Sequence, residues 1–285
     1  MENEYDIVIV GCGPAGLSAA INAKARNKSV LVAGGEFCSP KLHNSPRIDN
    51  YLGLPAINGE ALRQRFLEHV QAAKVPIETC KVTSVFPQEG GFLVQTDREQ
   101  QFSARALVLT LGVMRQTALT GEKEYLGKGV SYCATCDAMF FRGKRVAVVA
   151  YEKGAEEEAQ LLSETCEKVY YLPQYQDAVG EFGDNVEIIN AKPTAVKGEK
   201  IVEFLEIGQE HLEVNGIFII RESVPVEQLV PGIQLSGRFI QVDASMATTV
   251  PGVFAGGDCV GEPLQLAKAV GQGQVAALSA AKYLS

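Results

Sequence analysis

Apolar residues along the chain form short runs that alternate with longer amphipathic segments. Runs of β-branched and other apolar residues predict strands buried on both faces of a parallel sheet, at residues 5–10, 29–33, 106–110, 145–149 and 168–172. Apolar residues at helical spacing predict helices, at residues 17–26, 59–73, 154–166 and 264–284, the last interrupted by Gly271 and Gly273. Strand and helix alternate, which indicates an α/β fold.

Two stretches of the chain begin in the same way, with a strand, a tight turn and a helix. The first strand contains Ile7 and the second Val146, 139 residues later. Two further strand candidates, at 81–86 and 92–96, flank Gly90 and predict a hairpin. We therefore predict two Rossmann-like three-layer domains. Because no linker is visible at either junction, we expect the second domain, residues 113–242, to be inserted into the first, residues 1–112 and 243–285.

Composition fits a globular protein, since 46% of the residues are hydrophobic and 21% are charged. Glycine is in excess, at 28 of 285 residues, roughly 10% against a usual ~7%. The net charge of −8 disfavours electrostatic binding of nucleic acid. The acidic N-terminus lacks the basic start of a secretory signal, and the uncharged stretch at 7–22 is too short to span a membrane. A cytoplasmic protein without membrane association is expected.

The glycines cluster first in the turn after the first strand, at Gly11, Gly13 and Gly16. In this context the first glycine permits a tight turn, the second lets the backbone approach a pyrophosphate, and the third lets helix and strand pack closely. Glu36 lies where an acid could bind a ribose hydroxyl, although a solvated glutamate explains it equally well. Cys12, inside the turn, is interpreted as a packing residue.

One pair of cysteines, Cys133 and Cys136, has the CxxC spacing. Zinc would need two more ligands, but the other five cysteines are scattered singly and the three histidines form no pair, so no metal site is expected. An odd number of cysteines also argues against a secreted disulfide framework. A reversible disulfide is the better interpretation. Asp137 follows directly and could exchange a proton with a leaving thiolate.

Three motifs together resemble the low-molecular-weight thioredoxin reductases: the turn at 11–16, the CxxC segment at 133–137, and residues 250–258, which end in Gly256-Gly257-Asp258. The resemblance covers essentially the whole chain, with the motifs in the family's order. It implies an FAD domain built from both ends of the chain, an inserted domain that carries the CxxC pair, and a homodimer.

The resemblance also assigns roles to individual residues. Cys136 would face the flavin, Cys133 would attack the substrate disulfide and Asp137 would be the acid. Asp258 would bind the ribityl or phosphate region, with Asn50 and Gln265 near the isoalloxazine. The full set expected to bind FAD is Gly11, Gly13, Pro14, Ala15, Gly16, Glu36, Asn50, Gly112, Gly257, Asp258 and Gln265.

The sequence departs from this family at the second turn, where NADPH would bind. The family has roughly Gly-Gly-Gly-x-Ser-Ala, whereas residues 150–155 read Ala-Tyr-Glu-Lys-Gly-Ala. These side chains would block a pyrophosphate, and Glu152 would repel it. The family's His-Arg-Arg cluster for the 2′-phosphate is replaced by Leu-Pro-Gln-Tyr-Gln at 172–176. We therefore expect the domain fold to be retained and NADPH not to bind, with an unusual but working NADPH site as the alternative.

A subgroup of the family, the ferredoxin-linked flavin thioredoxin reductases, lacks both nucleotide motifs, and the chain resembles it. The resemblance implies that reduced ferredoxin supplies electrons and that a thioredoxin disulfide is reduced. The net charge of −8 does not favour an encounter with an acidic ferredoxin. Two other interpretations stay open: a flavin-dependent dithiol oxidase that passes electrons to oxygen, and a non-enzymatic FAD-holding redox sensor or docking protein.

Overall fold

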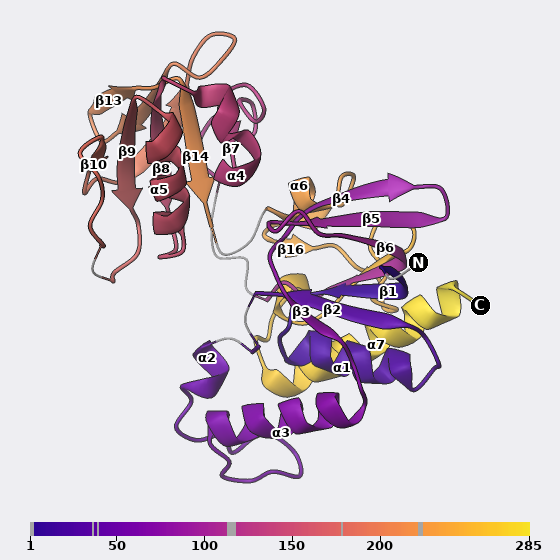
Figure 1. Cartoon of the computed structure of the whole chain (residues 1–285). Coiled ribbons are helices and arrows are strands. Elements are labelled where there is room, and N and C mark those ends of the chain that lie inside the picture. Colours follow the sequence, from indigo (N-terminus) through magenta and orange to yellow (C-terminus); the bar gives the residue numbers. More distant parts are fainter. Residues whose placement is uncertain (1–2, 36, 39, 113–117, 178, 222–224) are drawn as a thin grey trace. The chain divides into compact units, whose positions relative to one another are not determined.

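In a computed structural model the chain forms two compact units (Figure 1). The structure describes residues 3–35, 37–38, 40–112, 118–177, 179–221 and 225–285. The first unit comprises residues 1–114 and 225–285, and the second unit residues 115–224. The fold is α/β with two Rossmann-like units, as predicted.

The first unit is built on a seven-stranded sheet of order β3-β2-β1-β6-β5-β4, with β17 paired to the second half of β6. Strands β1, β2, β3, β6 and β17 are parallel to one another. Strands β4 and β5 form the predicted antiparallel hairpin, and β5 also pairs antiparallel with β6. The strands are β1 (Glu4–Val10), β2 (Val30–Gly34), β3 (Ile77–Thr79), β4 (Val82–Gln88), β5 (Gly91–Thr96), β6 (Gln101–Leu109) and β17 (Val253–Ala255).

Helices α1 (Pro14–Lys24) and α7 (Leu266–Tyr283) lie side by side against this sheet (Figure 1). Small residues let them approach closely: both α1 and α7 bury mainly alanines. The predicted interruption of the last helix is wrong, because α7 is continuous through both glycines. A β-carbon at Gly273 would overlap the Ala15 carbonyl oxygen, so this glycine serves close packing rather than a break.

Other helices complete the first unit. Helix α3 (Gly59–Ala72) contacts α1, and the short α2 (Pro40–His43) contacts α3. The Asn58 side chain caps α3 by accepting a hydrogen bond from the Ala61 N–H, 2.7 Å away. The 3-10 turn η2 (Asp258–Val260) follows β17. Ile7 and Ile9 of β1 join the core that α1 and α7 cover.

The second unit has three layers around a parallel sheet of order β10-β9-β8-β14-β7. Helix α5 (Ala155–Thr165), α4 (Ala134–Asp137) and the 3-10 turn η1 (Ala138–Phe141) lie on one side. An antiparallel sheet, β11 to β13, contributes to the core on the other side. The strands are β7 (Val130–Ser131), β8 (Arg145–Ala150), β9 (Lys168–Pro173), β10 (Val186–Ile188), β11 (Pro193–Lys197), β12 (Phe204–Ile207), β13 (Glu210–Glu213) and β14 (Gly216–Ile220).

Alternation along β8 explains why every residue from Val146 to Ala150 is apolar. In β8, Val146 and Val148 point into the core shared with α5, whereas Ala147 and Val149 point into the core shared with the antiparallel sheet. All four are fully buried. A strand covered on both faces therefore reads as a continuous apolar run.

The second boundary between the units differs from the predicted one. Residues 225–242, expected in the inserted domain, lie with the first unit. Helix α6 (Val226–Leu229) contacts β4, and β16 (Phe239–Ile240), paired with β15 (Leu235–Ser236), contacts η2. These short elements carry little periodicity, so the sequence did not reveal which sheet they join.

The five cysteines other than the CxxC pair are reduced thiols and are buried, including Cys12, which was expected to be a packing residue: Cys12, Cys38, Cys80, Cys166 and Cys259. Among the helices that the structure describes, none combines the length and apolarity that a membrane crossing needs.

Candidate functional site

The turn between β1 and α1 is shaped by two glycines, Gly11 and Gly16, at which a β-carbon would overlap backbone atoms. Gly11 has a φ of +116°, and a β-carbon there would overlap the Thr110 carbonyl oxygen. A β-carbon at Gly16 would overlap the carbonyl oxygen of Gly11. The Thr110 hydroxyl donates to the carbonyls of Val10 and Gly11, at 3.1 and 3.0 Å. The turn is thus held against the end of β6.

The same turn leaves space and hydrogen-bond donors for a phosphate group. Gly13 is the N-cap of α1, its backbone is extended, and no side chain caps the helix. A β-carbon at Gly13 would meet nothing within 4 Å. Pro14 begins the helix, where a missing N–H costs nothing. The uncapped N–H groups and the helix dipole favour an anion at this point.

The motif near the C-terminus lies beside this turn. A β-carbon at Gly257, whose φ is +88°, would lie 2.9 Å from the β-carbon of Ala15. The Lys268 ammonium donates to the carbonyl of Gly257 at 2.9 Å and also to that of Gly261. Burial lowers the pKa of Lys268, and Asp258 opposes this effect. The segment around Gly257 therefore lies next to the start of α1, although most of the chain separates the two in sequence.

Asn50 and Gln265, both expected near a flavin ring, contact each other directly. The Asn50 amide donates to the Gln265 side-chain oxygen at 3.0 Å, although the residues are 215 positions apart. Gln265 is the N-cap of α7, and Gly112, with a φ of +70°, follows β6. Glu36 lies outside the described residues. Apart from Glu36, the residues expected to bind FAD belong to the first unit, and the glycine turn at 11–16 leaves room and N–H donors for a phosphate group.

In the second unit, the corresponding edge between β8 and β9 is occupied by side chains. The Tyr175 hydroxyl donates to Glu156 in the first turn of α5, at 2.7 Å, and lies 3.0 Å from the Tyr171 hydroxyl. The bond from Tyr175 holds the pKa of Glu156 below its usual value. Gly180 donates its N–H to the same carboxylate at 3.2 Å. A negative charge and a phenol therefore stand where a dinucleotide's phosphates would approach.

A buried ion pair fills the next part of the same sheet edge. Arg221, directly after β14, donates to both carboxylate oxygens of Glu122 at 2.6 and 2.8 Å. Glu122 is fully buried and Arg221 is 6% exposed. Burial acts to raise the pKa of Glu122, but the hydrogen bonds and charge of Arg221 outweigh it and the pKa lies below its ordinary value. The Tyr151 ring lies 5.0 Å from the guanidinium.

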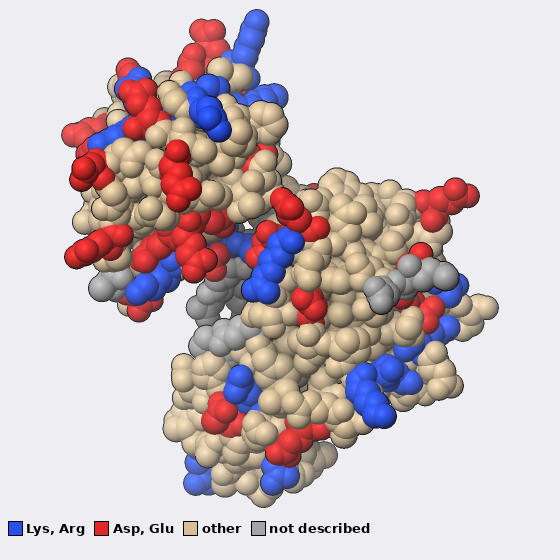
Figure 2. Space-filling model, in the orientation of Figure 1, with Lys and Arg blue, Asp and Glu red and all other residues tan. Residues whose placement is uncertain are grey.

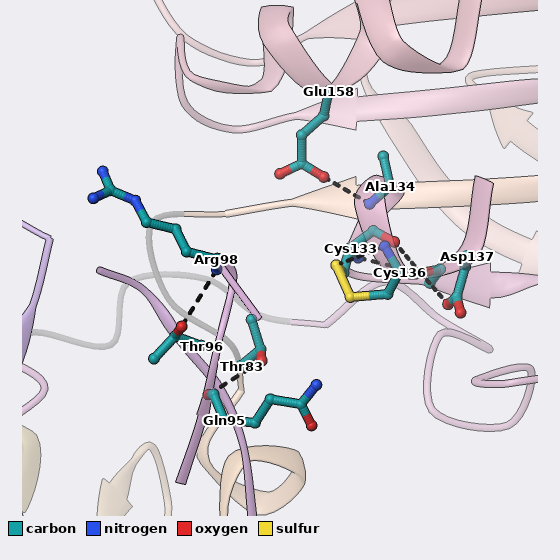
Figure 3. Close-up of a disulfide and its surroundings, with 10 residues drawn as sticks. Thr83, Gln95, Thr96, Arg98, Cys133, Ala134, Cys136, Asp137 and Glu158 are labelled. Carbon is teal, nitrogen blue, oxygen red and sulfur yellow. Dashed lines mark hydrogen bonds between the residues drawn. A yellow bond between two sulfur atoms is a disulfide. The ribbon is translucent and has the colours of Figure 1, made fainter. Parts of the chain in front are cut away.

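The CxxC pair forms a disulfide between Cys133, the N-cap of α4, and Cys136 (Figure 3). Cys133 is half-buried, whereas Cys136 is exposed. The Cys136 N–H is directed at the Cys133 sulfur, 3.1 Å away. On the other side of the turn, Glu158 of α5 accepts a hydrogen bond from the Ala134 N–H at 2.8 Å.

Asp137 is held beside the disulfide by a buried serine. The Ser131 hydroxyl donates to the Asp137 carboxylate at 2.7 Å and accepts a hydrogen bond from the Cys133 N–H at 3.2 Å. Sequence reasoning missed Ser131, although its position two residues before the CxxC pair was a usable signal. It also missed Glu122 and Arg221, for which no local pattern exists.

The net charge is distributed unequally between the units. The first unit has 14 Lys and Arg against 15 Asp and Glu, and the second has 12 against 19. Figure 2 shows acidic side chains gathered over the second unit. Nearly all of the net charge of −8 therefore belongs to the unit that carries the disulfide.

The chain is similar to known disulfide oxidoreductases over nearly its whole length. The family model for pyridine nucleotide-disulphide oxidoreductases matches residues 5–273. A thioredoxin reductase of Aquifex aeolicus is 32% identical over 302 residues, covering 99% of this chain and 94% of the relative.

Two solved structures of thioredoxin reductases are also similar to this chain over nearly its whole length. A ferredoxin-flavin thioredoxin reductase from Clostridium acetobutylicum is 44% identical, with a TM-score of 0.89 and coverage of 99% of this chain and 98% of that one. A thioredoxin reductase from Gloeobacter violaceus is 30% identical, with a TM-score of 0.78 and coverage of 99% and 95%.

Proposed function

The chain belongs to the pyridine nucleotide-disulphide oxidoreductase family, among its thioredoxin reductases, and we propose that it uses bound FAD and electrons from reduced ferredoxin, not NADPH, to reduce a thioredoxin disulfide. The observation that carries the choice of donor is the bond between Tyr175 and Glu156, because it fills the edge of the second unit where a nicotinamide dinucleotide would bind.

FAD would be held by the first unit. The pyrophosphate would meet the uncapped start of α1 at Gly13, and Asp258 would bind the ribityl or phosphate region. Asn50 and Gln265, already joined by a hydrogen bond, would lie near the isoalloxazine. When bound, the flavin supplies the ability to collect single electrons and deliver them in pairs.

Three features of the second unit oppose a nicotinamide donor. Tyr151 and Glu152 replace glycines that would let a pyrophosphate approach. The Glu156 carboxylate, kept ionised by Tyr175, adds repulsion at the helix start. Gln174 stands where a cation for a 2′-phosphate is expected, and its amide donates to the carbonyl of Ala191 at 2.9 Å. The second unit therefore lacks the expected features both for the pyrophosphate and for the 2′-phosphate of NADPH.

The charge distribution bears on how an acidic donor would meet the protein. An acidic ferredoxin would be repelled by the second unit, which carries a formal excess of seven negative charges. The first unit is nearly neutral, so it would repel an acidic ferredoxin less than the net charge of the whole chain suggests. We therefore place the encounter with ferredoxin on the first unit, which also holds the proposed flavin site.

The reduced Cys133–Cys136 pair would carry out the exchange with the acceptor. The Cys133 thiol would pass its proton to the Asp137 carboxylate, and the resulting thiolate would attack one sulfur of the acceptor disulfide to form a mixed disulfide. The second acceptor sulfur would leave as a thiolate and take that proton from Asp137. The Cys136 thiol would then lose its proton and attack the Cys133 sulfur, which restores the intramolecular disulfide, and the departing acceptor sulfur would take up one proton to complete the reduced acceptor. The N–H of residue 136 favours negative charge on Cys133, which supports Cys133 as the nucleophile.

An anaerobic titration tests the donor. We expect reduced ferredoxin to bleach the flavin absorbance of the purified holoprotein, and NADPH or NADH at equal concentration to leave it unchanged. Rapid bleaching by stoichiometric NADPH would overturn the proposal in favour of an atypical NADPH site. Peroxide formation during dithiol turnover, with no response to ferredoxin, would instead favour a dithiol oxidase.

The partners follow from the same proposal. A thioredoxin or thioredoxin-like protein would be the acceptor, and the protein would act as a homodimer in the cytoplasm. Light scattering of the purified holoprotein measures the mass in solution, and a value near one chain of 30.6 kDa would contradict the homodimer.

A further inference from the structure

Three aromatic or charged side chains follow three neighbouring parallel strands of the second unit. Tyr132 comes directly after β7, Arg221 after β14 and Tyr151 after β8, and the sheet places these strands in the order β8-β14-β7. Because parallel strands end at the same edge of a sheet, the three side chains converge there. Glu122 joins them from the segment before β7. The disulfide exchange proposed above uses none of the four, and only Tyr151 is among the features that oppose a nicotinamide donor.

These residues form one connected network. The Tyr132 hydroxyl donates to the Glu122 carboxylate at 2.7 Å, and its ring lies 6.0 Å from the Arg221 guanidinium. The Leu119 N–H donates to the second Glu122 oxygen at 2.7 Å. Arg221 holds both oxygens at once, which fixes the orientation of the carboxylate. Tyr132 is thus anchored to a buried and rigid charge.

Tyr132 is also the residue immediately before Cys133. Its neighbour Ser131 points the other way, to Asp137 and to the Cys133 backbone. Tyr132 packs against the core on the side of the antiparallel sheet and bonds to Glu122, whereas Ser131 bonds to Asp137, so the segment leading into the disulfide is held by contacts on two sides. On one side it is held by the serine, and on the other by the ion pair.

We propose that Glu122 and Arg221 are positioning residues for the redox reaction: acting through Tyr132, they hold the start of the CxxC turn so that the N–H of residue 136 stays directed at the Cys133 sulfur. This inference rests on the proposed role of Cys133 in disulfide exchange. It does not depend on which donor reduces the flavin.

The physical consequence lies in the reduced state. An N–H aimed at a sulfur favours the thiolate over the thiol, and the thiolate is the reactive form. If the turn loosens, the sulfur loses this donor for part of the time and a smaller fraction of Cys133 is ionised at neutral pH. The carboxylates that also face the turn, Asp137 and Glu158, are unchanged by altering Tyr132.

The test measures alkylation of Cys133 in the full-length flavoprotein. In a Cys136→Ser background, which keeps the N–H of residue 136, iodoacetamide modification of Cys133 is followed by mass spectrometry from pH 6 to 10. We expect Tyr132→Phe to slow the alkylation of Cys133 about tenfold at neutral pH. The alkylation rates with and without Tyr132→Phe should become equal at about pH 10, where the Cys133 thiol is ionised in both proteins.

A matched control removes a similar bond elsewhere on the same sheet edge. Tyr175 is half-buried like Tyr132 and also donates to a glutamate at 2.7 Å, but it does not adjoin the CxxC turn. Tyr175→Phe should leave the alkylation profile unchanged. Superimposed profiles for all three proteins, or an equal displacement in both tyrosine variants, would overturn the inference.

A second substitution tests the same inference if circular dichroism shows that Tyr132→Phe does not fold. Arg221→Lys keeps the charge but cannot bind both carboxylate oxygens. The same slowing at neutral pH supports the inference, and an unchanged profile in a folded protein contradicts it. Since alkylation needs neither ferredoxin nor thioredoxin, failure of the proposed donor leaves this result intact.

Discussion

Gly273 of α7 lies directly against the carbonyl group of Ala15 in α1, so that the last helix of the chain and the first are in backbone contact. This contact sets the Gly257 segment beside the glycine turn of α1. The two ends of the chain thereby build one proposed FAD site.

Gly273→Ala should destabilise the first unit by about 1–3 kcal/mol, because the new methyl group overlaps the Ala15 carbonyl. Urea denaturation and the flavin content after purification measure the effect. Gly271→Ala is the control, since a β-carbon there meets nothing within 4 Å, and alanine should stabilise the helix by roughly 0.5–1 kcal/mol. Equal effects of both substitutions would contradict this account.

Arg221→Met should lower the free energy of unfolding by about 3–5 kcal/mol, because it leaves the Glu122 charge buried without its partner. Urea denaturation followed by circular dichroism measures the loss. The double substitution Glu122→Leu with Arg221→Met removes both charges and should recover much of the stability. If the double variant is as unstable as the single one, packing rather than charge is responsible.

Acid should weaken the second unit through Glu122. The pKa of this group is lowered in the folded state from its ordinary value of 4.5. Its stabilising contribution is therefore fully present above about pH 4.5 and is lost as the pH falls through the lower folded value. Glu122→Gln should reduce the slope of unfolding free energy against pH in this acid range only. An unchanged acid slope would contradict the assignment.

Cys136→Ser should leave the flavin bound and let the acceptor accumulate as a mixed disulfide on Cys133, because residue 136 no longer supplies the thiol that releases the reduced acceptor. Cys133→Ser should abolish turnover and trap nothing. Non-reducing gel electrophoresis with an oxidised thioredoxin distinguishes the two variants. A trapped complex in Cys133→Ser would reverse the assigned roles.

Replacing Ala150, Tyr151 and Glu152 by glycine should not create NADPH use. Tyr175 and Glu156 would still occupy the edge between β8 and β9, and residues 172–176 contain no Lys or Arg to bind a 2′-phosphate. Anaerobic flavin absorbance after NADPH addition gives the readout. Efficient bleaching in this triple variant would show that the glycine turn alone decides which nucleotide binds.

The main elements of both units could be predicted because their signals are local. Residues 7–10 of β1 and 146–150 of β8 are uninterrupted apolar runs, and all of these residues are buried. The glycine turn and the CxxC pair are likewise local, because each needs particular residue types at fixed spacing. The short elements at 225–240 have no such requirement, and only their contacts show that they join the first unit.

The networks around the candidate site could not be predicted, because they join residues far apart in sequence. Glu122 and Arg221 are 99 positions apart, and nothing in either local sequence indicates the other. Tyr175 was visible as a departure from a basic cluster. That it meets Glu156 depends on the geometry of α5 and β9, which the pattern of apolar residues does not specify.

Five further thiols share the chain with the reactive pair, and their burial insulates the redox chemistry. Burial raises the pKa of Cys12, Cys80 and Cys259 to about 11, and that of Cys166 in the same direction. These four thiols stay protonated at neutral pH, so they are poor nucleophiles toward the Cys133–Cys136 disulfide or a trapped acceptor. Disulfide exchange between these four thiols and the proposed redox pair is therefore slow, and an electrophilic label added after reduction would react with Cys133 and Cys136 in preference to them.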